Sequence, residues 1–131
     1  MIVLDASAVV ELLLDTPTGR RVAILLDDPA VGVHVPHLLD VEVTSALRRY
    51  VRDGALDRED AAAALEDLVA LDFQRHSHEA LVERAWALRD NLSAYDAVYV
   101  ALAEALPARL FTCDRRLAKA PGTKVKAEVI T

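Results

Sequence analysis

The sequence is poor in aromatic residues and in positive charge, and each shortage weakens one class of function. Only 5% of the 131 residues are aromatic, so stacking of bases on aromatic platforms is not expected as the main mode of nucleic-acid binding. The formal net charge is −6, which argues against a general polyanion binder. A nucleic-acid substrate stays open, because a bound cation would offset part of that charge.

Cysteine and long apolar runs are also scarce. The single cysteine, Cys113, cannot form an internal disulfide, and no second cysteine supports a thiolate metal site. No apolar stretch has the length of a membrane span, and the start of the chain lacks the basic region and long apolar run of a signal peptide. There is no glycine-rich nucleotide-binding signature. We therefore expect a protein of the reducing cytoplasm.

The residues that are abundant predict one compact α/β domain over residues 1–131. With 53% hydrophobic and 27% charged residues, the chain can build a core. Short apolar runs predict strands at 2–4, 31–35, 73–76, 109–112 and 125–130. Helical spacing of apolar residues, with Ser7, Asp57 and Ser93 as predicted caps, predicts helices at 8–14, 18–28, 37–52, 58–71, 79–89, 94–106 and 114–119. This alternation favours a mainly parallel central sheet flanked by helices.

Four acidic residues stand just past a strand or near the start of a helix, namely Asp5, Glu42, Asp96 and Asp114. In open α/β sheets, ligands bind outside the carboxyl ends of the strands, where residues far apart in sequence can meet. Several carboxylates in one cleft suit Mg²⁺, with Mn²⁺ as a possible substitute. We therefore predict a carboxylate metal site at this edge of the sheet.

Each acid also has a simpler explanation. Asp5 and Asp114 could cap the helices that follow them, and Asp96 could form a short capping box with Ser93. Glu42 could be a solvated helix residue. The metal site is favoured because all four simpler explanations would have to hold together at one end of the inferred sheet.

The segments around these acids resemble the motifs of a known family. Residues 2–10, 35–49, 92–103 and 110–118 match, in order, the sequence motifs of PIN-domain ribonucleases, with 92–103 the most specific. Within that family the chain resembles a VapC-type toxin of a type II toxin–antitoxin system. The resemblance implies an Mg²⁺-dependent endoribonuclease, RNA as substrate, a cognate antitoxin that inhibits it, and a homodimer. It assigns metal binding and catalysis to Asp5, Glu42, Asp96 and Asp114, with Ser7 and Thr112 as polar support.

Basic residues follow two of the acids and are candidates for RNA contacts. Arg48, Arg49 and Arg52 come after Glu42, and Arg115, Arg116 and Lys119 come after Asp114. They could bind phosphate oxygens beside the cut. The alternative is that they favour helix ends and solubility, as basic residues in last turns often do.

Apolar residues of the first helices exceed what a small core needs, and some could form a groove for an antitoxin helix. The candidates are Val9, Val10, Leu13, Leu14, Leu38, Leu39 and Val43, with simple core packing as the alternative. Trp86 is predicted to pack in a helix interface. The four histidines and Cys113 are not expected to bind metal or to act as nucleophiles. The main rival function is a noncatalytic RNA- or protein-binding module that keeps the fold and uses metal for stability.

Overall fold

A parallel sheet of five strands forms the centre of the computed structural model, which describes residues 1–131. The strands lie in the order β3-β2-β1-β4-β5, and every neighbouring pair is parallel. Their bounds are Ile2–Leu4 for β1, Val33–Pro36 for β2, Gln74–His76 for β3, Arg109–Thr112 for β4 and Ala127–Val129 for β5. The predicted α/β class with a parallel sheet is confirmed.

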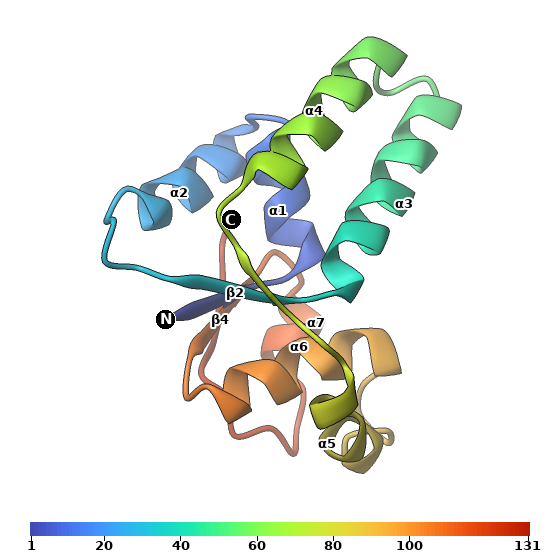
Figure 1. The fold of residues 1–131 in the computed structure, drawn as a ribbon. Helices are drawn as coiled ribbons and strands as arrows, with labels where there is room; N and C mark the ends of the chain where they lie inside the picture. Colours follow the sequence, from blue (N-terminus) through green and yellow to red (C-terminus); the bar gives the residue numbers. More distant parts are fainter.

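Helices cover both faces of this sheet. Figure 1 shows α1 to α4 on one side and α5 and α6 on the other, with α3 and α4 forming a long hairpin. The helices are α1 (Ala6–Leu13), α2 (Pro17–Leu26), α3 (Leu38–Arg52), α4 (Arg58–Ala70), α5 (Val82–Ala87), α6 (Ala94–Ala105) and α7 (Arg115–Ala118), with a 3₁₀ turn at Glu79–Leu81. None of them is both long and apolar enough to cross a lipid bilayer.

The core lies between the sheet and these helices because the inner strands are apolar on both faces. All of β1 is buried, as expected for a central strand of a parallel sheet. Seven consecutive residues of α6, Ala97–Ala103, are also buried. Their small and branched side chains let this helix pack closely against β1 and β2. The predicted site therefore rests on the buried layers formed by β1 and α6.

The start of α1 differs from the prediction. The helix begins at Ala6, and its N-cap is Asp5, whose carboxylate accepts a hydrogen bond from the Ala8 amide at 3.1 Å. Ser7 is therefore not the cap. Ser93 does cap α6, accepting from the Asp96 amide at 3.2 Å. Asp57 occupies the N-cap position of α4 but makes no capping bond with its side chain, so that prediction is wrong.

Most other differences are in the ends of elements. The strands predicted at 31–35 and 125–130 are shorter and shifted, because pairing with a neighbouring strand, rather than apolar composition, decides where a strand ends. The helix predicted at 79–89 divides into the 3₁₀ turn and α5. Trp86 on α5 is 68% exposed, with the Arg89 guanidinium over its ring, so its predicted packing role is wrong.

The strand order places a crevice at the carboxyl ends of β1 and β4. From β1 the chain proceeds outward to β2 and β3, and it then returns to the other side of β1 with β4. Connections diverge at such a switch point and leave a crevice there. Asp5 follows β1 directly, and Asp114 lies two residues past β4. The topology thus gives the predicted site its location.

Candidate active site

Asp5 lies at the bottom of the site and is almost completely buried. Its Oδ1 accepts hydrogen bonds from Ser7 Oγ at 2.6 Å and from the Ala8 amide, and its Oδ2 accepts one from Thr112 Oγ1. Burial raises the pKa of Asp5, although these hydrogen bonds act in the opposite direction. Asp5 therefore caps α1 and also lies within electrostatic reach of Asp96, so the two explanations of its position are compatible.

Ser7 and Thr112 connect Asp5 to the segment after β4. Ser7 Oγ accepts from the Cys113 amide and Thr112 Oγ1 accepts from the Asp114 amide, each at 2.9 Å. Both hydroxyls also donate to Asp5. These bonds fix the end of β4 against the start of α1, which fits the supporting role that the sequence predicts for them.

Asp114 begins α7 as its N-cap. Its Oδ1 accepts a hydrogen bond from the Arg116 amide at 2.8 Å, and the Arg116 side chain lies 3.6 Å from the same oxygen. The capping role weighed as the simpler alternative for Asp114 is thus present. It leaves Oδ2 without a hydrogen-bond partner, so Asp114 can also serve the site.

Glu42 and Asp96 face the same crevice from α3 and α6. The hydroxyl of the buried Tyr99 donates to Glu42 Oε1 at 2.6 Å. Burial raises the pKa of Glu42, and the charges of Asp96 and Asp5 raise it further, against the effect of the Tyr99 bond. Burial and the charge of Asp114 raise the pKa of Asp96. Asp5, Glu42 and Asp96 thus lie within electrostatic reach of one another, and Asp114 lies within reach of Asp96.

The donor set is suited to a hard divalent cation. The four acids and the nearby hydroxyls offer only oxygen atoms, which Mg²⁺ and Mn²⁺ prefer. No three acidic, histidine or cysteine side chains converge closely enough to enclose an ion. Mg²⁺ commonly binds through one or two carboxylates and completes its shell with waters and substrate phosphate oxygens. The residues therefore fit an open site of this kind and not a closed protein cage.

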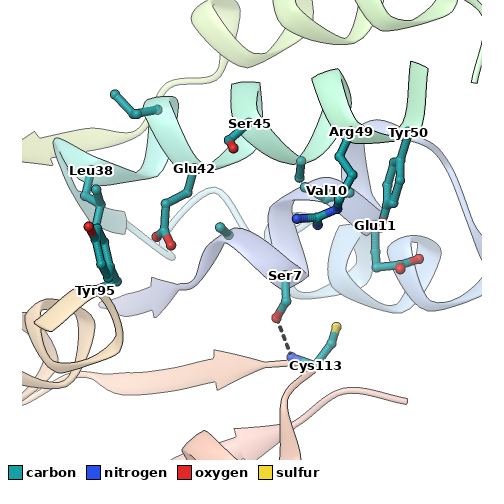
Figure 2. Close-up of a pocket in the computed structure, with 13 residues that line it drawn as sticks. Ser7, Val10, Glu11, Leu38, Glu42, Ser45, Arg49, Tyr50, Tyr95 and Cys113 are labelled. Atoms are coloured by element: carbon teal, nitrogen blue, oxygen red, sulfur yellow. Dashed lines mark hydrogen bonds between the residues drawn. The ribbon is translucent and has the colours of Figure 1, made fainter. Parts of the chain in front are cut away.

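A groove of about 550 Å³ lies between α1 and α3, and of the four acids only Glu42 lines it. Figure 2 shows Glu42 and Tyr95 at one end, Arg49 and Tyr50 at the other, and Ser7 on the opposite wall. The remaining lining residues are Ala6, Val10, Glu11, Leu38, Val41, Ser45, Ala46 and Cys113. Glu42 thus lies toward one end of the groove, and Arg49 lies with Glu11 toward the other.

The structure separates the basic residues that the sequence grouped together. Arg49 lines the groove and forms no ion pair, whereas Arg48, its neighbour on α3, does not line it. Arg115 and Arg116 lie outside the groove, and Arg116 is 94% exposed beside Asp114. Arg49 is therefore the predicted RNA contact with the most suitable position.

The apolar residues proposed for an antitoxin groove also divide into two groups. Val9, Leu39 and Val43 are fully buried in the core, so for these three the alternative of simple core packing holds. Val10 and Leu38 do line the groove. Leu13 and Leu14 are partly buried at the end of α1. Leu13 borders a second hollow between α1, α2 and α4, and Leu14 packs at the edge of the core.

Two contacts among polar residues were missed by the sequence analysis. The first is the hydrogen bond from the Tyr99 hydroxyl to Glu42. Tyr99 stands three residues after Asp96, a spacing that puts both on one helix face, so the sequence did contain a signal that Tyr99 lies beside the site. His34 and His76 form a ring-to-ring hydrogen bond of 2.8 Å between β2 and β3. No local pattern indicates that second contact, because the partners are 42 positions apart.

Comparison with known proteins gives consistent results. The family model described as PIN domain matches residues 2–122. The chain is 45% identical to VapC ribonuclease Mb0985 of Mycobacterium bovis over 117 residues, which is 89% of this chain and 88% of that protein. The fold is similar to that of VapBC2 from Rickettsia felis bound to a promoter DNA fragment, with TM-score 0.73, 14% identity and all of both chains covered. It is also similar to a toxin–antitoxin complex from Klebsiella pneumoniae, with TM-score 0.62, 18% identity and coverage of 100% and 98%.

Proposed function

The chain belongs to the PIN-domain family and, within it, to the VapC ribonucleases, and on this basis we propose that it is a metal-dependent endoribonuclease toxin. It hydrolyses phosphodiester bonds of RNA in the cytoplasm with Mg²⁺, for which Mn²⁺ can substitute, and a cognate antitoxin inhibits it. The observation that carries this proposal is the gathering of Asp5, Glu42, Asp96 and Asp114 around the carboxyl ends of β1 and β4, where burial and the charges of neighbouring acids raise the pKa of Asp5, Glu42 and Asp96.

The chemistry follows from the properties of this crevice. A divalent ion held there would polarise an attacking water and offset charge on the phosphoryl oxygens. The protein's own contribution is to hold its carboxylates in place. Ser7 and Thr112 fix Asp5, and Asp5 lies at the junction of β1 and α1, where its backbone is held by the sheet and the helix. Such rigid support keeps reacting groups in productive geometry.

The groove supplies a path for the RNA chain beside the carboxylates. Glu42 and Arg49 are seven residues apart on α3, so they lie on nearly the same face and about 10 Å apart along the helix axis. A guanidinium there can bind a phosphate next to the one being cut. We assign this role to Arg49, while Arg48, Arg115 and Arg116 remain secondary candidates because they do not line the groove.

The same open groove calls for a partner that covers it, since an uncontrolled nuclease would degrade the RNA of its own cell. We propose that a segment of the antitoxin binds against Val10 and Leu38 and places a basic side chain near the acids. The similarity to a solved toxin–antitoxin complex supports an antitoxin as the partner. We also propose that the chain forms a homodimer, as the family resemblance implies. The exposed Val82 and Trp86 of α5 are apolar surface available for it.

The test is RNA cleavage by the purified chain and by Asp5→Asn, Glu42→Gln, Asp96→Asn and Asp114→Asn. Each substitution keeps the side-chain shape and removes one charge, so each should lower cleavage by at least about 100-fold while the fold, followed by circular dichroism, persists. Chelation should abolish cleavage, and Mg²⁺ or Mn²⁺ should restore it. A chain that binds RNA or antitoxin but never cleaves RNA would instead be a noncatalytic module.

A further inference from the structure

The buried hydroxyl of Tyr99 forms the one hydrogen bond that links α6 to Glu42. Tyr99 is 1% exposed, and its hydroxyl lies 2.6 Å from Glu42 Oε1. Figure 1 shows α3 and α6 on opposite sides of the sheet, so this bond joins the two helical layers beyond the strand ends. It therefore sets the position of one wall of the site relative to the other.

The bond also fixes how Glu42 can present its carboxylate. A tyrosine hydroxyl has one proton to donate, and here that proton is committed to Oε1. The Glu42 carboxylate forms no other hydrogen bond with the protein, and the side chain borders the groove. Only Oε2 is thus left without a protein partner. Without Tyr99 the half-buried glutamate would be free to rotate, and both of its oxygens would take water.

The position of Tyr99 on α6 strengthens this interpretation. It lies one turn after Asp96, so a single helix face carries both an acid of the site and the group that holds another acid. A residue filling the core alone would not need a hydroxyl, because a polar atom buried without a partner costs stability. The hydroxyl is satisfied by a site carboxylate rather than by a backbone group.

We propose that Tyr99 is a positioning residue of the metal site, which holds Glu42 through Oε1 and leaves Oε2 as the oxygen that would be available to a divalent ion. This inference rests on the proposed metal-dependent function, but it concerns ion binding and can be tested without RNA. Loss of a hydrogen bond to a metal-binding side chain typically weakens metal affinity by about 10- to 100-fold. Tyr99→Phe keeps the buried ring and removes only the hydroxyl oxygen.

The experiment measures Mn²⁺ affinity by titration calorimetry for the full chain, Tyr99→Phe, Glu42→Gln and the double variant. We expect Tyr99→Phe to bind Mn²⁺ about tenfold more weakly, and we expect it to add little in the Glu42→Gln background, because it acts through that residue. Thr44→Val is the matched control. It removes one hydroxyl from α3 at an exposed side chain that donates only to the Asp40 carbonyl and does not line the groove, and it should leave Mn²⁺ affinity unchanged.

A second control separates positioning from stability. Val22→Ala removes two buried methyl groups on α2, far from the site, and should lower the melting temperature without changing Mn²⁺ affinity. If Tyr99→Phe binds Mn²⁺ as tightly as the unaltered chain, the positioning role is overturned and the proposed function stands. If the two losses of affinity simply add in the double variant, Tyr99 does not act through Glu42 and the proposal also fails. If the unaltered chain itself binds no Mn²⁺, the metal-dependent function is overturned, and the positioning role fails with it.

Discussion

Two variants, Arg49→Ala and Arg48→Ala, test whether the groove is the path of the RNA. Both side chains are exposed and belong to the same helix, but only Arg49 lines the groove. The two variants lose the same charge and almost the same helix propensity. Any difference between them in RNA binding therefore comes from position and not from net charge.

The expected magnitude follows from one lost phosphate contact. Hydrogen bonds to charged groups contribute about 1.5–3 kcal/mol, and the low end applies because Arg49 stays in contact with solvent. A loss of about 1.4 kcal/mol corresponds to tenfold weaker binding. Each phosphate contact on a single strand also adds about 0.7 to the slope of log affinity against log salt. Arg49→Ala should therefore reduce that slope by about 0.7, and Arg48→Ala should leave it nearly unchanged.

The assay uses the Asp5→Asn chain, so that the RNA is not cut during the measurement. Fluorescence anisotropy of a short labelled single-stranded RNA is followed between about 50 and 200 mM salt, the range over which such contacts have large effects. Equal slopes and equal affinities for the two arginine variants would refute the assigned path. The basic residues of α3 would then serve solubility, as the alternative in the sequence analysis holds.

Three further predictions concern stability. Burial raises the pKa of Asp5, so its ionised form destabilises the metal-free fold at pH 7. The Asp5→Asn variant keeps an acceptor for Ser7 and Ala8 and should therefore melt at a higher temperature than the unaltered chain. This gain in melting temperature should vanish at acid pH, where Asp5 is protonated. Burial and the neighbouring His76 lower the pKa of His34, so the free energy of unfolding should fall as the pH drops below about 6.5. The His34→Gln variant should lack the part of this fall that comes from His34, and a variant with the same pH profile as the unaltered chain would contradict the prediction. Arg75 pairs with Asp40 through two hydrogen bonds of 2.8 and 3.0 Å and also donates to the Leu68 carbonyl near the end of α4. Arg75→Ala should therefore lower the free energy of unfolding, measured with denaturant, by about 1–3 kcal/mol. Arg20→Ala is the control at an exposed ion pair and should lower it by less than about 0.5 kcal/mol.

The sequence by itself determined the elements whose signals are local. The strands at 2–4 and 109–112 have the predicted bounds, because short buried apolar runs between polar residues have few other solutions. The cap at Ser93 was predicted for a similar reason, since it depends on an amide three residues away. The placement of Asp5 and Asp114 just past β1 and β4 was also sufficient to predict their meeting, because parallel strands bring their carboxyl ends to one edge. Glu42 and Asp96 instead reach the site from within α3 and from the start of α6.

Only the tertiary structure decided the contacts between layers. Thr112 reaches Asp5 across 107 positions and Tyr99 reaches Glu42 across 57, and neither separation leaves a periodic signal in the sequence. The choice of Arg49 over Arg48 depends on which face of α3 borders α1, and the exposure of Trp86 depends on what α5 leaves uncovered. The physical reason is the same in each case. Local patterns fix the backbone hydrogen bonds of single elements, whereas side-chain partners depend on how those elements pack against one another.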